Sequence, residues 1–138
     1  MRKGLLKLKN LEIGVNTIID VGAAAGSWTI MAKDIWPECS YILFEPLEER
    51  QAELGKLAHD HPGIFIVPFA AGNTINETSF YIADDLDGSG VANDSEEFQN
   101  IRMVKQTSID IETKRLDLKG PYIIKLDTHG YEVPILEG

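Results

Sequence analysis

A stretch of glycine, alanine and β-branched residues at positions 17–26, TIIDVGAAAG, constrains the fold of this chain more than any other part. Its β-branched beginning is typical of a strand buried in a parallel sheet. The run breaks into small residues at Gly22, and a helix-like segment, 27–35, follows directly. A strand, a tight turn of small residues and a helix form the ligand-binding half of a doubly wound α/β unit. The stretch therefore predicts an α/β fold with a ligand lying against this turn, because small side chains leave the backbone accessible.

Strands and helices alternate in the first half of the chain. Apolar runs at 40–45 and 63–68 predict two more strands, and a charged helix is expected between them, from Pro46 to about residue 59. An amphipathic helix is expected over 2–13, where leucines recur near helical spacing. Alternation of this kind indicates a mainly parallel sheet.

The second half of the chain follows another pattern. Segments 78–82 and 103–109 have the composition of strands without a convincing helix between them, and we expect them to pair antiparallel at one end of the sheet. Segment 121–127 is a further expected strand, and a helix is expected from residue 131 onward. We expect a single domain over 1–138, since this length suits one core and is short for two domains.

Composition narrows the class of partner and the compartment. The formal net charge of −9 argues against non-specific binding of nucleic acid and favours a small-molecule partner. The chain has no apolar run of the roughly 20 residues that a membrane-spanning helix needs, and no apolar core of a secretory leader. Cys39 is the one cysteine, which suits a reducing compartment. These features predict a cytoplasmic protein with neither a membrane nor a nucleic-acid partner.

Asp20 indicates which kind of glycine turn this is. A dinucleotide-binding fingerprint would need glycines at 22, 24 and 27, and the last two are missing. The pattern Asp-x-Gly-x-x-x-Gly, by contrast, fits fully with Asp20, Gly22 and Gly26. It resembles the first motif of S-adenosylmethionine-dependent methyltransferases of the Rossmann-like class. A plain packing motif of strand, turn and helix is the alternative.

Glu45 ends the second expected strand. An acidic residue at this place can accept hydrogen bonds from both ribose hydroxyls of an adenosyl cofactor. We expect Asp20 to hold the amino group of the cofactor or the turn itself. A surface carboxylate at the end of a strand is the plainer alternative for Glu45.

Three polar residues, Lys125, Asp127 and His129, come at the end of the last expected strand. Ligands of open α/β sheets bind beyond the carboxyl ends of the strands, so Asp127 and His129 should lie at the mouth of the same crevice. A lysine inside an apolar strand is costly unless it is paired, although it can also extend to water. We expect His129 to take the proton of an acceptor hydroxyl, with a solvated histidine as the alternative.

Four blocks extend the resemblance from about residue 15 to the end of the chain. They are Asp20-Val21-Gly22-Ala23, Phe44-Glu45-Pro46, Thr107-x-x-Asp110, and Lys125-Leu126-Asp127-Thr128-x-Gly130-Tyr131-Glu132 with ILEG at 135–138. In this order and spacing they resemble the FkbM family of methyltransferases. At the position of His129 that family often has an acidic residue.

The resemblance implies a Rossmann-like class I methyltransferase fold, with three α/β/α layers and a mainly parallel sheet. It also implies S-adenosylmethionine as cofactor and O-methylation of a small molecule such as a sugar or a polyketide. The cofactor-binding residues would be Asp20, Gly22, Ala23, Gly26, Glu45 and Pro46, with Phe69 and Ala70 near the adenine. The catalytic candidates are Asp127, His129 and Lys125, and no metal is expected.

The chain stops where the family continues with further strands. We therefore expect a sheet truncated after its fourth core strand, which leaves segment 121–127 with an open apolar edge. An edge of this kind is a template for pairing with another chain, so we expect dimerisation or aggregation through it.

The acidic segment 84–97 offers a competing interpretation. Its residues Asp85, Asp87, Ser89, Gly90, Val91, Asn93 and Glu96 have the spacing of an EF-hand calcium loop. A strand, and not the required helix, is expected before it, so we favour an acidic loop near the substrate mouth. Two other functions stay open: a nicotinamide-dependent oxidoreductase, and a non-catalytic domain that binds a cofactor or calcium.

Overall fold

A four-stranded parallel sheet, sheet A, lies at the centre of the computed structural model, which describes residues 1–92 and 99–138. Its strands follow the order β3-β2-β1-β8. They are β1 (Thr17–Val21), β2 (Ser40–Phe44), β3 (Ile64–Val67) and β8 (Tyr122–Leu126). Each neighbouring pair runs parallel. The mainly parallel sheet that the sequence predicts is confirmed.

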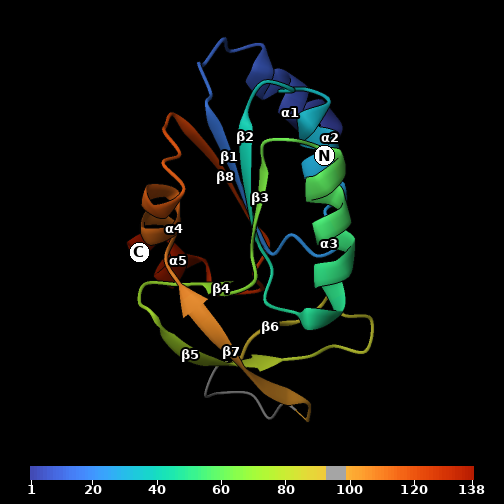
Figure 1. Ribbon diagram of the computed structural model, residues 1–138, viewed down its shortest axis with the longest axis vertical. Coiled ribbons are helices and arrows are strands. Elements are labelled where there is room, and N and C mark those ends of the chain that lie inside the picture. The colour runs from blue at the N-terminus through green and yellow to red at the C-terminus, as the bar shows by residue number, and fades with distance from the viewer. Residues whose placement is uncertain (93–98) are drawn as a thin grey trace.

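Helices cover both faces of sheet A (Figure 1). On one face lie α1 (Arg2–Lys9), α2 (Ser27–Lys33) and α3 (Glu48–Asp60), and on the other α4 (Ile109–Arg115) and α5 (Glu132–Glu137). Side chains alternate along a strand, so Ile18 packs toward α2 and α3, whereas Ile19 packs toward α4 and α5. The protein therefore has three layers, helices, sheet and helices, with one apolar core on each face of sheet A.

A second sheet, sheet B, lies beyond the carboxyl ends of the strands of sheet A (Figure 1). Its strands, in the order β4-β7-β5-β6, are β4 (Ala70–Ala71), β5 (Asn76–Tyr81), β6 (Gly90–Val91) and β7 (Ile101–Thr107). β5 and β7 pair antiparallel, with Thr78 opposite Val104, which confirms the expected pairing. They form a sheet of their own, however, and are not hydrogen-bonded to sheet A.

Two of the expected boundaries differ from the structure for identifiable physical reasons. The strand expected over 103–109 ends at Thr107, because Ser108 caps α4 by accepting a hydrogen bond from the Ile111 N–H (3.3 Å). The helix expected over 2–13 ends at Lys9. Beyond it Leu11 and Ile13 are exposed, so no packing extends the helix.

β8 forms one edge of sheet A within the described residues, and its Tyr122 and Ile124 are exposed. The open edge expected at this strand is therefore present in that part of the chain. No helix in residues 1–92 and 99–138 has the length and apolar character needed to cross a membrane.

Candidate functional site

A pocket of about 280 Å³ lies where the strands of sheet A end against sheet B. Its walls come from the turn after β1, the residues after β2 and β8, and the loop between β5 and β6. Carboxyl ends of parallel strands meet here, which is where open α/β sheets bind ligands. Most of the site residues that the sequence predicts line this pocket, namely Gly22, Ala23, Glu45, Pro46, Ala70, Lys125 and Asp127.

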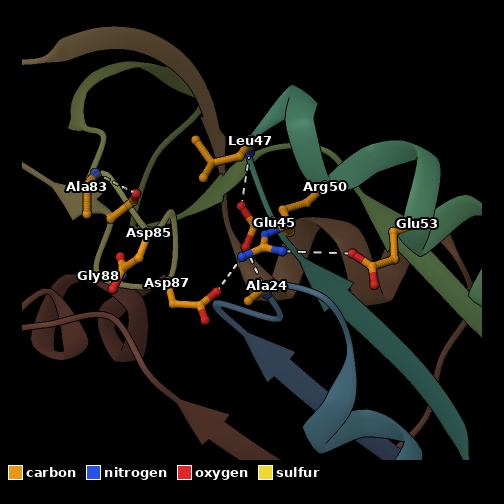
Figure 2. Close-up of polar contacts among 10 residues, drawn as sticks. Ala24, Glu45, Leu47, Arg50, Glu53, Ala83, Asp85, Asp87 and Gly88 are labelled. Carbon is orange, nitrogen blue, oxygen red and sulfur yellow. Dashed lines mark hydrogen bonds and ion pairs between the residues drawn. The ribbon is translucent and has the colours of Figure 1, made fainter.

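Glu45 presents a buried carboxylate to the pocket, with only 5% of the residue exposed. Its Oε2 accepts a hydrogen bond from the Ala24 N–H (2.9 Å), and its Oε1 accepts one from the Leu47 N–H (3.0 Å) (Figure 2). A carboxylate can accept about four hydrogen bonds, so each oxygen keeps one acceptor position. Burial raises the pKa of Glu45, and the two backbone donors oppose this rise.

Asp20 lies behind the turn and not on the pocket wall. It is completely buried, and its Oδ2 accepts a hydrogen bond from the Thr29 hydroxyl (2.6 Å). Its Oδ1 lies 2.9 Å from the Lys125 Nζ. Burial raises the pKa of Asp20, while the Lys125 ammonium and the Thr29 hydroxyl lower it in part. Of the two roles expected for Asp20, this geometry suits the one of holding the turn.

Lys125 joins the end of β8 to the end of β1. Besides its ion pair with Asp20, its Nζ donates a hydrogen bond to the Gly22 carbonyl oxygen (2.8 Å) and lies 3.5 Å from the Asp127 Oδ2. An ammonium has three donors and no acceptor, and three oxygens surround this one. Of the two alternatives for this lysine, pairing within the protein and extension to water, the structure shows the first, and its partners indicate that it holds the site together.

Gly22 and Gly26, the two glycines of the turn, are required by close protein neighbours and by their backbone conformation. A Cβ added at Gly22 would lie 2.4 Å from the Asp127 carbonyl oxygen, and one at Gly26 would lie 2.5 Å from the Leu57 Cδ2. Both glycines have positive φ angles, 72° and 80°, which L side chains rarely adopt. The sequence argument that these positions leave space for a ligand therefore needs revision, since their neighbours are protein atoms. The alanines between them, among them Ala24, do line the pocket.

The remaining predicted residues separate into two groups. Asp127 lines the pocket with an exposed side chain, next to Lys125. His129 is exposed, with a φ of 53°, and is not among the described residues that line the pocket. Phe69 packs in the core toward α4 and α5, so its neighbour Ala70 reaches the pocket in its place.

Sequence reasoning assigned no pocket residues on one wall. Leu86, Asp87 and Ser89 line it from the loop between β5 and β6, and Tyr131 lines it from the start of α5. The Tyr131 hydroxyl donates to the Gln106 Oε1 on β7 (3.2 Å), so this side chain links α5 to sheet B. The only signal in the sequence was the acidic composition of the loop, which indicated a position near the substrate mouth.

The carboxylates of the supposed calcium loop have partners within the protein. The Asp85 Oδ1 accepts a hydrogen bond from the Gly88 N–H (3.1 Å), and Asp87 forms an ion pair with Arg50. Asn93 and Glu96 lie outside the described residues. In the described ranges, 1–92 and 99–138, no group of three or more His, Cys, Asp or Glu side chains is placed to hold a metal ion.

These features define an α/β protein whose parallel strands end at a pocket with a buried glutamate. A family model described as the methyltransferase FkbM domain matches residues 20–138. The chain belongs to this family of methyltransferases, whose reaction needs a methyl donor. The match begins at Asp20 and spans every predicted site residue. No curated protein and no solved structure matched the chain.

Proposed function

We propose that the pocket binds S-adenosylmethionine and that the protein transfers its methyl group to a hydroxyl of a small molecule, such as a sugar or a polyketide. The fold would then be a Rossmann-like class I methyltransferase fold. The observation that carries this proposal is the buried Glu45 carboxylate at the carboxyl end of β2, which faces the pocket with acceptor capacity left over.

The lining residues fit an adenosyl ligand. Glu45 would accept hydrogen bonds from the two ribose hydroxyls, and Ala23 and Ala24 would let the chain of the ligand lie close to the turn. Leu47 and Ala70 line the pocket and pack in the same apolar cluster, where an adenine ring would find apolar contacts. When bound, S-adenosylmethionine supplies an electrophilic methyl group.

Asp127 is the stronger candidate for taking the proton of the acceptor hydroxyl. Its carboxylate lies at the pocket, and Lys125 and the backbone of β1 fix the segment that carries it. A base held within reach of the hydroxyl contributes to catalysis through both proton transfer and orientation. His129 is the second candidate, because its loop follows Asp127 directly, although its side chain lies outside the pocket lining.

Calorimetry on the purified protein tests the proposal. We expect S-adenosylmethionine and S-adenosylhomocysteine to bind, and Glu45→Ala to weaken binding by about 1.5–3 kcal/mol, because the ribose hydroxyls lose their acceptor. Glu48→Gln is the matched control, since Glu48 is exposed in the first turn of α3. Tighter binding of NADH than of either adenosyl ligand would overturn the proposal in favour of an oxidoreductase.

For partners, we propose a small-molecule acceptor in a cytoplasmic protein and self-association through the exposed edge of β8. Light scattering at several concentrations checks the association. A mass that stays at the monomer value over the whole range would remove it.

A further inference from the structure

The loop at residues 83–89, between β5 and β6, holds its shape through contacts of its own. The Leu86 N–H donates to the Ala83 carbonyl oxygen (3.0 Å), and the Ser89 N–H donates to the Leu86 carbonyl oxygen (3.2 Å). The Ala83 N–H in turn donates to the Ser89 Oγ (2.9 Å). We call these residues the pocket loop, since Leu86, Asp87 and Ser89 line the pocket.

Arg50 connects the pocket loop to α3. It forms an ion pair with Asp87 and lies 3.8 Å from the Glu53 carboxylate. Figure 2 shows Arg50 between these two carboxylates, with Glu45 and Ala24 close beside it. The Arg50 side chain is 17% exposed, and its buried Nε has no hydrogen-bond partner among the described residues. The ion pair therefore joins the pocket loop to α3 beside Glu45 (Figure 2).

We propose that the pocket loop opens and closes over the Glu45 end of the pocket, and that the Arg50–Asp87 ion pair holds it closed. Asp87 is 69% exposed, so water can solvate its carboxylate when the ion pair breaks, and Arg50 keeps the Glu53 carboxylate within 3.8 Å. The internal hydrogen bonds of the loop do not involve Arg50 and survive this change. Opening would expose Glu45 and let a ligand enter, so Arg50 and Asp87 are gating residues and not catalytic ones.

The chain offers a matched control on the same helix. Glu49 and Arg102 form a two-fold hydrogen-bonded ion pair (2.8 and 3.0 Å) that also joins α3 to sheet B, through β7. Neither residue lines the pocket. If ion pairs between α3 and sheet B served stability alone, Glu49→Gln and Asp87→Asn would have the same effects.

Relaxation-dispersion NMR on the ligand-free protein tests the opening directly, because it detects minor states on the microsecond to millisecond timescale. We expect Asp87→Asn to raise the population of an open state for amides 83–89 about two- to fivefold. Glu49→Gln should leave these amides unchanged, and Asp87→Glu, which keeps the charge, should resemble the wild type. An unchanged open population in Asp87→Asn would overturn the proposal.

Stopped-flow binding of S-adenosylhomocysteine, followed by the fluorescence of the pocket residue Trp28, tests the gating. This arm rests on the proposed function. For Asp87→Asn we expect association and dissociation to accelerate by similar factors, about two- to fivefold, so that the dissociation constant changes little. Faster dissociation alone would make Asp87 a direct ligand contact and contradict a gate. If the wild type binds no adenosyl ligand, the proposed function fails, and the dispersion result alone decides the loop proposal.

Discussion

Asp20 and Asp87 each pair with a largely buried cation at one wall of the same pocket, but the Asp20 carboxylate is buried and the Asp87 carboxylate is open to water. Asp20 is completely buried beside Lys125, whereas Asp87 is largely exposed beside Arg50. Removing one partner from a buried pair costs about 3–5 kcal/mol, because it leaves a buried charge uncompensated. A pair whose carboxylate stays in contact with water contributes less than this, because that carboxylate loses little solvation when the pair forms. The wall from sheet A is therefore fixed, and the wall from sheet B can be displaced.

This division suits a methyl transfer. The fixed wall carries Glu45, which is proposed to hold the methyl donor, and Asp127, which is proposed to take the proton of the acceptor hydroxyl. Rapid reaction requires that such groups stay in place. The displaceable wall carries no proposed reacting group and controls access, as closing loops do in many enzymes.

Replacing the base on the fixed wall should have the largest effect. We expect Asp127→Asn to lower the release of S-adenosylhomocysteine from S-adenosylmethionine, with sugar hydroxyls as acceptors, by about 10²–10⁴-fold. Cofactor affinity should barely change, because the substitution leaves Glu45 and the turn intact. His129→Ala is the comparison, and we expect nearly full turnover because this side chain lies outside the pocket lining. A greater loss in His129→Ala would move the base to the histidine.

Breaking the buried pair should have the next largest effect. We expect Lys125→Met to lower the free energy of unfolding by about 3–5 kcal/mol, because Asp20 is left as an unpaired buried carboxylate. Chemical denaturation measures this loss, and adding Asp20→Asn to the variant should restore part of it. Lys119→Met removes the exposed pair with Asp117 and should leave the denaturation midpoint unchanged. Equal losses in the two single variants would show that burial does not separate the two kinds of pair.

Gly22 tests how tightly the end of β1 meets the end of β8. Gly22 and Gly63 both have positive φ angles, but a Cβ at Gly63 would find its nearest atom only at 3.9 Å. Gly63→Ala therefore measures the backbone strain alone, about 1–2 kcal/mol. We expect Gly22→Ala to cost about 1–3 kcal/mol more, because its Cβ would meet the Asp127 carbonyl oxygen. Thermal or chemical denaturation gives both values, and equal costs would mean that the two strand ends are not packed against each other.

The pH dependence of stability should show the smallest effect. Burial raises the pKa of Glu45 above its ordinary value of 4.5, so between these two values the folded protein binds more protons than the unfolded chain. The contribution of Glu45 to the free energy of unfolding therefore falls as the pH rises through this window. Glu45→Gln should remove this fall, which denaturation at several pH values measures. A variant with the same slope as the wild type would show that the folded state does not raise this pKa.

The sequence was sufficient for the parallel part of the fold because its signals are local. The β-branched run before Gly22 and the apolar run before Glu45 each predict a strand, and parallel strands bring their ends together. The cost of a lysine in an apolar strand likewise singled out Lys125, with pairing and extension to water as the two alternatives. Its partner Asp20 could not be derived from the sequence, because Asp20 lies in a distant part of the chain and only the pairing of β1 with β8 brings the two residues together.

The wall formed by the pocket loop was harder to predict, because its contacts join residues that are distant in the sequence. The partner of Asp87 is Arg50, which comes from a helix early in the chain and belongs to no local pattern. The spacing of Asp85 and Asp87 imitated a calcium loop, while their actual contacts are a backbone N–H and a guanidinium. The short helix α4 was hidden by its isoleucines, whose β-branched side chains favour strands.

A crystal structure of the complex with S-adenosylhomocysteine tests most directly whether Glu45 holds the ribose. We expect both ribose hydroxyls within about 2.5–3.0 Å of the Glu45 carboxylate oxygens, with the hydrogen bonds from the Ala24 and Leu47 N–H groups retained. A ligand whose ribose lies elsewhere, with Glu45 bound only to these two backbone groups, would contradict the proposal.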